Sequence, residues 1–421
     1  MLSGTSLRLV LLVSCAHAMV HLYELALPSV EQQIAAEFYA DEISGKRLTG
    51  LLSNSWRFTW GFGALAAGWL VDRYGGRRML AVYLMGCALT CVAVGLSRSE
   101  VSLYLAMFMM GLFASIYHPA GLALISHETT AQNRPHALGI HGIFGSFGIG
   151  SAPLVAVVFL MSGYDWRQFY WALAMAGLLL SLVFVFKAVN ERAADTRTTP
   201  VDADPEDQEA MWLSYFVLIV LGMLQGFVYA GIMSFLPRYL SSISLSTETL
   251  TGVGFVSEML TSGAEKESFG KIFATVVLLI GCVGQYLAGR FGRPDALEKQ
   301  LTGIMFASVP FLFWMAVAQS GDRLIAAGLF ALVHFMAQPI YNSLIAKYTP
   351  AARRSLCYGL SFAMGFGVGG VGALFVGFST SQFITYGTLA GMSLGSGILG
   401  VFLWNHNRLR DPAKQESGSP V

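Results

Sequence analysis

Charged residues are scarce in this sequence of 421 amino acids. Only 12% of the residues are Asp, Glu, Lys or Arg, whereas soluble domains contain roughly 25%. The formal net charge is +1, so no excess of basic residues points to nucleic acid or another polyanion as a partner. In place of charge the chain has apolar side chains: 55% of the residues are hydrophobic and the mean hydropathy is +0.59. This composition predicts a protein embedded in a lipid bilayer.

Cysteines are few, and the common cofactor motifs are missing. The five cysteines lie inside apolar segments and form no CxxC pair, which favours small buried side chains over disulfides or thiolate metal sites. The sequence contains no P-loop, and its glycine-rich segments do not follow strands, so ATP-driven transport and dinucleotide chemistry are not supported. No nucleophile–base pair is recognisable. We therefore expect a protein that is not an enzyme and has neither a cofactor nor a bound metal.

Twelve apolar segments are long enough to cross a bilayer, whose hydrocarbon core needs about 20 helical residues. The first one contains Ala16-His17-Ala18, which resembles a signal-peptidase site. Because the apolar run continues to Pro28, we expect this segment to be retained. The pattern predicts an all-α membrane protein whose spans lie near residues 7–28, 48–71, 79–97, 101–126, 137–161, 168–188, 212–237, 270–290, 299–318, 322–347, 355–378 and 383–404.

The distribution of basic residues predicts the orientation of the chain. With the N-terminus inside, the inner loops and tails hold 17 of the 26 lysines and arginines, and the outer loops hold eight. Basic residues accumulate on the cytoplasmic side of membrane proteins. We therefore expect a multi-pass protein of the inner (plasma) membrane, monomeric, with both termini in the cytoplasm.

The chain repeats itself. Residues 117–155 reappear at 337–375 with a constant offset of 220, so that Pro119 aligns with Pro339. Such a repeat predicts two similar halves, an architecture that in membranes is typical of secondary transporters with a substrate site between the halves. The polar stretch between the halves reads as a linker. The predicted organisation is a six-helix bundle (1–189), a cytoplasmic linker (190–211), a second six-helix bundle (212–407) and a cytoplasmic tail (408–421).

A motif joins the second and third predicted spans: Gly68-Trp69-Leu70-Val71-Asp72-Arg73-Tyr74-Gly75-Gly76-Arg77-Arg78. Its first glycine permits close helix approach and its later glycines permit a tight turn. The motif resembles the signature loop of the major facilitator superfamily, close to G-x-L-x-D-R-x-G-R-R. The resemblance covers nearly the whole chain and implies twelve helices in two pseudo-symmetric six-helix bundles. It also implies that the motif controls alternating access through Gly68, Asp72, Arg73, Gly75, Arg77 and Arg78.

The predicted span 137–161 is rich in glycine. Glycines follow one another at three-residue spacing from Gly139 to Gly148, and Pro153 comes shortly after. Small residues at this spacing make a flat face for close packing, and residues 365–372 repeat it. Together with His118-Pro119 on the preceding span, this arrangement resembles the fosmidomycin-resistance-type exporters of the superfamily. The preceding span lacks, between residues 105 and 111, the arginine of the drug/proton antiporters.

The first span carries His17, His21 and Glu24 on one helical face. Ionisable groups inside a membrane face the bundle interior or a water-filled cavity. Arg57 lies at a depth similar to that of Glu24. Either the two side chains pair with each other, or Arg57 binds a substrate anion and Glu24 takes up a proton. Two other interpretations stay open: a buried structural network, and a metal site formed by the two histidines and the glutamate.

Further candidates lie on other spans. His118 and His141 are on the fourth and fifth spans, and His334 is on the tenth. The tryptophans Trp56 and Trp60 flank Arg57 and either line a substrate pocket or anchor the helix at the membrane interface. Pro119 and Pro339 are expected to interrupt the helical hydrogen-bond ladder.

These observations predict a secondary transporter in which two halves rock about a site at the middle of the membrane. We expect proton-coupled export of a small organic compound, with the substrate, protons and the lipid bilayer as the only partners. Uptake of an organic anion by proton symport is the alternative, followed by transport of a metal ion or lipid, or a receptor on the same fold. The expected substrate- or proton-binding residues are His17, His21, Glu24, Arg57, Trp60, His118, His141 and His334.

Overall fold

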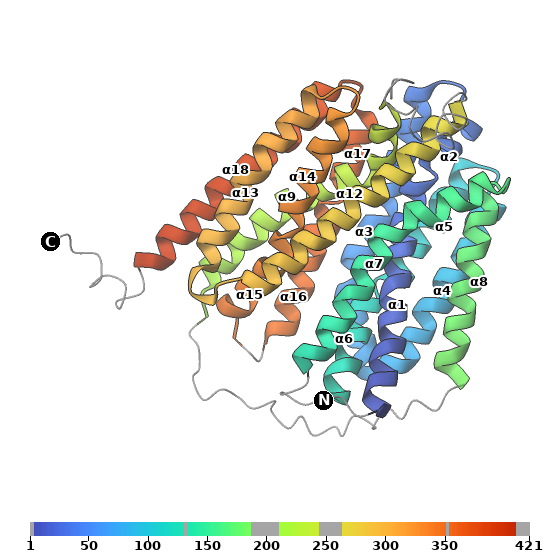
Figure 1. Ribbon diagram of the computed structural model, residues 1–421. Coiled ribbons are helices and arrows are strands. Elements are labelled where there is room, and N and C mark those ends of the chain that lie inside the picture. The colour runs from blue at the N-terminus through green and yellow to red at the C-terminus, as the bar shows by residue number, and fades with distance from the viewer. Residues whose placement is uncertain (1–3, 130–133, 187–209, 244–262, 351–352, 410–421) are drawn as a thin grey trace.

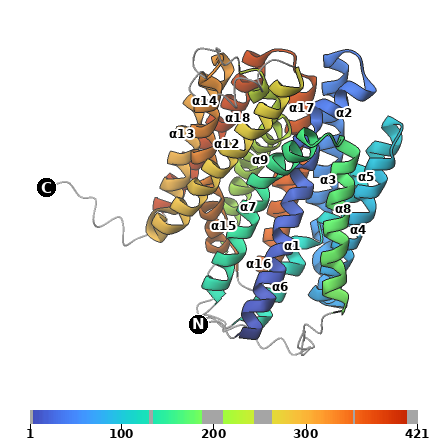
Figure 2. The ribbon, with the colours of Figure 1, turned by 45° about the vertical axis from the view of Figure 1, so that its right-hand side comes forward.

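The computed structural model describes residues 4–129, 134–186, 210–243, 263–350 and 353–409, and within these ranges every regular element is a helix. Two groups of helices stand side by side (Figures 1 and 2). The first group is α1 (Gly4–Ser29), α2 (Glu31–Phe38), α3 (Glu42–Tyr74), α4 (Gly76–Leu96), α5 (Glu100–Ala114), α6 (Tyr117–Glu128), α7 (Arg134–Met161) and α8 (Trp166–Phe186). The second is α9 (Trp212–Ser241), α12 (Gly263–Phe291), η1 (Pro294–Ala296), α13 (Leu297–Val317), α14 (Asp322–Phe335), α15 (Ala337–Tyr348), α16 (Arg354–Phe362), η3 (Ala363–Val368), α17 (Val371–Phe378) and α18 (Gln382–Leu409).

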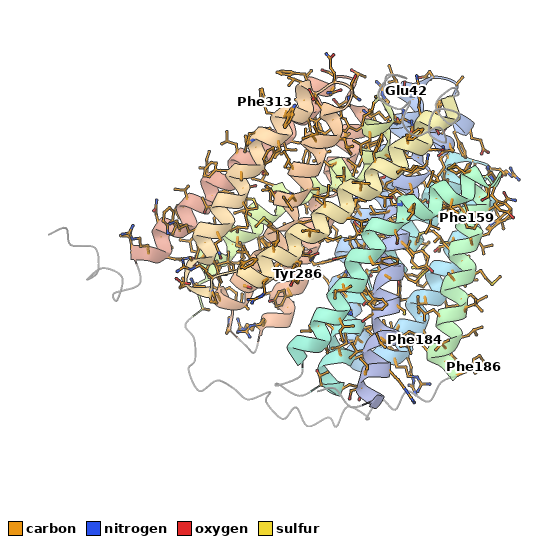
Figure 3. All side chains as sticks on the ribbon, in the orientation of Figure 1. Glu42, Phe159, Phe184, Phe186, Tyr286 and Phe313 are labelled. Atoms are coloured by element: carbon orange, nitrogen blue, oxygen red, sulfur yellow. The ribbon has the colours of Figure 1, made fainter. Side chains whose placement is uncertain are left out.

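The predicted spans correspond to these helices. Eleven spans in the described ranges are long and apolar enough to cross a membrane. The twelfth, α3, crosses the bundle as well, but polar residues such as Ser53, Asn54 and Arg57 interrupt its apolar middle. Large apolar side chains point outward around the bundle: Phe186 is 78% exposed and Tyr286 is 68% exposed (Figure 3). A surface of this kind requires lipid around it, so the chain is a multi-pass membrane protein.

The predicted domain boundaries stay a prediction. Almost all of the expected linker 190–211, and the expected tail from residue 410 onward, lie outside the described residues. The two helix groups nevertheless have largely separate cores. One cluster of buried apolar side chains runs from Leu9 to Phe184 within the first group. Two further clusters are built almost entirely from the second group, and Leu25 is among the few residues of the first group that join them.

The aligned prolines interrupt two helices at equivalent places, as the repeat predicted. One span is broken between α5, which ends at Ala114, and α6, which begins at Tyr117. The other is broken between α14 and α15, around Met336. Proline has no N–H to donate to the carbonyl four residues earlier. The ladder therefore fails one turn before Pro119 and one turn before Pro339.

The glycine faces pack as predicted over part of their length. A side chain at Gly148 of α7 would meet the Ala18 backbone of α1 at 2.4 Å, and one at Gly369 would meet the Gly226 backbone of α9 at 2.9 Å. Both helices thus lie against the first helix of their own group, where only glycine fits. At Gly139 and Gly142, by contrast, no atom of a neighbour lies within 4 Å. The face that packs against a neighbouring helix is therefore shorter than the run of glycines in the sequence.

The predicted burial of the cysteines holds for three of the five. All five are free; Cys87, Cys91 and Cys357 are buried, Cys282 is half-buried, and Cys15 is exposed on α1. Its helix position turns it to the outside of the bundle, where an apolar thiol is compatible with lipid.

We call the end of the bundle that carries α2 the α2 face, and the end that carries the N-terminus the termini face (Figure 1). At the α2 face the two groups are tied by polar contacts. Arg238 of α9 donates from Nε to Glu31 Oε2 at 2.7 Å and from Nη1 to Glu42 Oε1 at 2.6 Å. Lys46 donates to the carbonyl of Ser379 at 2.8 Å. The α2 face is therefore closed in this conformation.

A pH-dependent contact secures α2 to its own group. Glu37 accepts hydrogen bonds from Arg167 Nη1 and, at 2.8 Å, from Trp166 Nε1. The bond from Arg167 holds the pKa of the Glu37 carboxyl below its usual range. A lowered folded-state pKa contributes stability that is complete above the unfolded value, about 4.3, and is lost as the pH falls through the folded value. We expect Glu37→Gln to lower the melting temperature at pH 7 and to have progressively less effect below pH about 4. Melting curves of both proteins in detergent test this, and a difference independent of pH would contradict it.

Candidate functional site

A buried ion pair lies between α1 and α3. Arg57 Nη1 is 3.1 Å from Glu24 Oε1, and the exposed fractions of the two side chains are 2% and 0%. Pairing was one of the two arrangements expected from their similar depth on two spans, and it is the one present in this structure. Charges buried in this way are stable only when each is matched by a partner and by further hydrogen bonds.

Glu24 has two more partners. His21 Nδ1 lies 2.7 Å from Glu24 Oε2, and the Tyr229 hydroxyl donates to Oε1 at 2.9 Å. The Arg57 guanidinium also lies over the Tyr229 ring, 5.3 Å from its centre. Tyr229 belongs to α9, so a residue of the second group completes a charge site built by the first. The carboxylate is thus the point where the two groups share hydrogen bonds in the middle of the bundle.

Four histidines gather beside the ion pair, and we call them the histidine cluster: His17, His21, His118 and His141. His17 is central, because its ring centre is 5.0 Å from that of His21, 5.6 Å from His118 and 4.1 Å from His141. Its Nδ1 is 2.9 Å from the carbonyl of His141. The cluster joins α1, α6 and α7, so the structure brings together four of the predicted site residues that the sequence separates by up to 124 positions.

Trp60 belongs to the same region. It is 1% exposed, and its ring packs against His118 and against Phe362 and Phe366 of the second group. Trp56 is 4% exposed and lies 4.7 Å from Trp60, centre to centre. Interfacial anchoring is therefore wrong for both tryptophans: α3 carries them into the bundle interior. Neither indole N–H has a hydrogen-bond partner among the described residues.

A small cavity lies beside the ion pair. Glu24 and Arg57 line it together with residues that include Ser53, Trp56 and Met107. The cavity is lined by a polar pair, an unused indole donor and apolar walls, and in this conformation it has room for about one water molecule.

His334 lies elsewhere. It is buried in the second group, where its ring stacks on Phe330 at 5.0 Å and on Tyr229 at 6.1 Å. The structure therefore separates it from the histidine cluster and places it behind Tyr229. Its Nδ1 has no hydrogen-bond partner among the described residues.

The motif residues of the predicted gate lie at the termini face. Gly75 has φ 86° and separates α3 from α4, as a turn glycine should. Arg77 donates from Nε to the carbonyl of Phe184 at 2.8 Å and so caps α8. Asp72, Arg73 and Arg78 are exposed, and no hydrogen bond or ion pair reaches Asp72 from the described residues. The expected close approach at Gly68 is not made either, since no neighbouring atom lies within 4 Å of a Cβ there. These two contacts of the predicted gate are therefore absent among the described residues in this conformation.

Two functional candidates were not selected from the sequence. They are Tyr229 of α9 and Tyr117 of α6. The structure puts Tyr229 on Glu24, and it puts the Tyr117 hydroxyl 3.4 Å from His141 Nε2. The sequence spacing of these residues predicts neither contact, because each partner lies on another helix.

The fold and the site together define a class of protein. Two groups of membrane-spanning helices that enclose a buried charged site form the architecture of a secondary transporter. The family model of the Major Facilitator Superfamily matches residues 11–373. The chain belongs to this superfamily, so the predicted fold is confirmed.

Several known proteins are similar to the chain. The fosmidomycin resistance protein of Escherichia coli is 22% identical over 82% of this chain and 80% of its own length. The puromycin resistance protein pur8 of Streptomyces alboniger is 33% identical over 30% of this chain. The chain spans 25%, 30% and 60% of the lengths of the first three curated relatives that it matches. Among solved structures, a bacterial homologue of the human lysosomal transporter Spinster has a TM-score of 0.71 at 13% identity, over 97% of this chain and 98% of that one.

Proposed function

We propose that this protein exports a small organic compound in exchange for protons, from a site at Glu24 and Arg57. The observation that carries the proposal is the buried Glu24–Arg57 pair closed by Tyr229 of the other helix group. The similarity to two drug-resistance proteins supports export. We further propose that the protein lies in the inner (plasma) membrane as a monomer, with both termini in the cytoplasm, so that the termini face is cytoplasmic.

The coupling follows from competition for Glu24. While Arg57 and Tyr229 bind the carboxylate, its charge is matched and no proton is needed. A substrate that donates hydrogen bonds or carries a positive charge takes the place of those donors on the Glu24 carboxylate, and it requires that carboxylate to be charged. A proton on Glu24 removes the negative charge, so the proton and the substrate exclude each other, as exchange requires. Because Tyr229 is on the second group, the same exchange loosens a contact between the two groups and favours the change to the other conformation.

Proton-coupled uptake of an organic anion is the second candidate. It is favoured by one feature: the Arg57 guanidinium lies over the aromatic ring of Tyr229 and lines the same cavity as Trp56, whose indole N–H has no partner among the described residues. Such surroundings suit a carboxylate that carries an apolar body. The direction in which protons move with the substrate distinguishes the two candidates.

The test begins with a ligand. Metabolites and antibiotics are screened by thermal shift on purified protein, and hits are assayed in proteoliposomes that contain a pH-sensitive dye. We expect substrate and protons to move in opposite directions, and Glu24→Gln to abolish substrate-driven proton movement.

Glu298→Gln is the matched control for this assay. Glu298 is also a buried carboxylate in an ion pair, 2.6 Å from Lys347, but it lies in the second group away from the site. We expect this variant to keep coupled transport. Proton movement that persists in Glu24→Gln would overturn the role of Glu24, and movement in the same direction as the substrate would favour uptake.

A further inference from the structure

We propose that three residues of the histidine cluster, His17, His21 and His118, bind a divalent transition-metal ion such as Zn²⁺. One ring nitrogen from each of the three lies within 4.8 Å of the other two. The residues come from α1 and α6, so the site lies inside the first helix group beside the ion pair. This inference is independent of the proposed function, because it concerns binding at equilibrium.

The hydrogen bonds of two histidines fix which nitrogen is available. His17 Nδ1 faces the carbonyl of His141, which only accepts hydrogen bonds, so Nδ1 carries the proton and donates it. His21 Nδ1 faces Glu24, a carboxylate that is already paired with Arg57 and therefore also accepts. In the neutral form of each ring the lone pair is consequently on Nε2. A neutral imidazole with its Nδ1–H held by a carbonyl or carboxylate is the usual form of a metal-binding histidine.

The sequence left open that Glu24 is a metal ligand together with His17 and His21. The structure gives Glu24 another role. Its oxygens accept from Arg57, Tyr229 and His21, so it is occupied and orients His21 rather than binding the ion. His118 takes the third place. The span is broken one turn before Pro119, and α6 begins at Tyr117, so His118 lies in the first turn of the new helix. Its ring centre is 5.6 Å and 6.0 Å from those of the two α1 histidines.

The geometry is close to that of a three-histidine site. Zinc–nitrogen bonds of 2.0–2.1 Å in a tetrahedron place the nitrogens about 3.4 Å apart. One nitrogen of each ring already lies within 4.8 Å of the other two, so the longest of these separations exceeds the tetrahedral spacing by at most about 1.4 Å. Three neutral imidazoles leave the fourth position open to water or to an anion, and an anion there provides the negative charge that the ligands lack.

The ligand set indicates the class of ion. Imidazole nitrogen suits Zn²⁺, Co²⁺, Ni²⁺ and Cu²⁺, whereas Mg²⁺ and Ca²⁺ require oxygen ligands. We therefore expect the site to discriminate strongly against the two alkaline-earth ions.

The experiment measures metal binding by the full chain, purified in detergent with a tag that contains no histidine. Zn²⁺ is titrated against a chromophoric chelator, and Co²⁺ is added separately because its visible absorption reports tetrahedral nitrogen ligation. We expect one tight ion per chain, a visible Co²⁺ spectrum and no competition by Mg²⁺. His17→Gln and His118→Gln should each weaken this binding by at least about tenfold and remove the Co²⁺ spectrum.

Two controls keep the result interpretable. His334→Gln changes a buried histidine of the second group, and it should leave the tight binding unchanged. Melting curves without metal show whether each variant is folded. If folded His17→Gln and His118→Gln proteins bind Zn²⁺ as the parent does, or if no tight ion binds to the parent, the site is overturned. Loss of coupled transport in Glu24→Gln has no bearing on this outcome, so the two proposals fail separately.

Discussion

Removing either member of the central ion pair alone should destabilise the protein by about 3–5 kcal/mol, because the remaining charge is left buried without its partner. We expect this for Glu24→Leu, which leaves Arg57 unmatched at 2% exposure, and for Arg57→Met, which leaves Glu24 unmatched at 0%. The double variant Glu24→Leu/Arg57→Met should recover most of the loss, since no unmatched charge remains. The free energy of unfolding in mixed micelles, measured for all four proteins, gives the coupling energy directly.

The pair Arg238–Glu42 provides a contrast within the same chain. It also joins two helices, with an Nη1–Oε1 distance of 2.6 Å, but the Glu42 side chain is 80% exposed. Exposed pairs contribute about 0–1 kcal/mol, so Glu42→Gln should change the free energy of unfolding very little. A similar cost at Glu24 and at Glu42 would contradict the argument from burial.

The double variant also separates stability from function. It should be folded and nearly as stable as the parent, yet show no substrate-driven proton movement, since it has neither a proton acceptor nor a cation at the site. If it transported substrate with the parent's proton coupling, the pair would be a structural contact only, and the site would have to lie elsewhere.

Much of the architecture was predictable from local patterns. Apolar length identified the spans, and the 220-residue repeat identified equivalent helix breaks before Pro119 and Pro339. The ion pair could also be predicted, because two costly charges at one depth need each other. All of these inferences use information that lies within a single helix or in the comparison of two stretches of chain.

The contacts between helix groups were not predictable in this way. Tyr229 reaches Glu24 across 205 positions, and Arg238 reaches Glu31 across 207. The spacing of neither pair follows from helix geometry. Each contact depends on how the two helix groups dock, and many side chains together determine that docking. The tryptophans show the same limit, since burial of Trp56 and Trp60 depends on which face of α3 meets the second group.

The docking of the two groups gives the other large prediction. At the α2 face, α3 and α17 meet glycine to glycine: a Cβ on Gly50 would lie 2.8 Å from the Cα of Gly377 and 3.1 Å from the carbonyl oxygen of Ala373. Both obstacles are backbone atoms, so no side-chain rotation makes room. Gly50→Leu should therefore act as a wedge that opens the α2 face. Secondary transporters of this architecture alternate by movement of the two halves as bodies about the central site, so we expect the termini face to close at the same time.

Distances between spin labels measure this change. One pair of labels, at Ile43 and Phe383, reports the α2 face, and the other, at Tyr74 and Leu356, reports the termini face; all four positions are exposed. In Gly50→Leu we expect the first distance to lengthen and the second to shorten, with coupled transport lost because the protein cannot return. Gly391→Leu is the matched control: it adds the same side chain to a helix where nothing lies within 4 Å, and both distances should stay as in the parent. A Gly50→Leu protein that melts earlier but keeps both parental distances would show that the glycine contact serves packing alone, and that the α2 face opens at another seam.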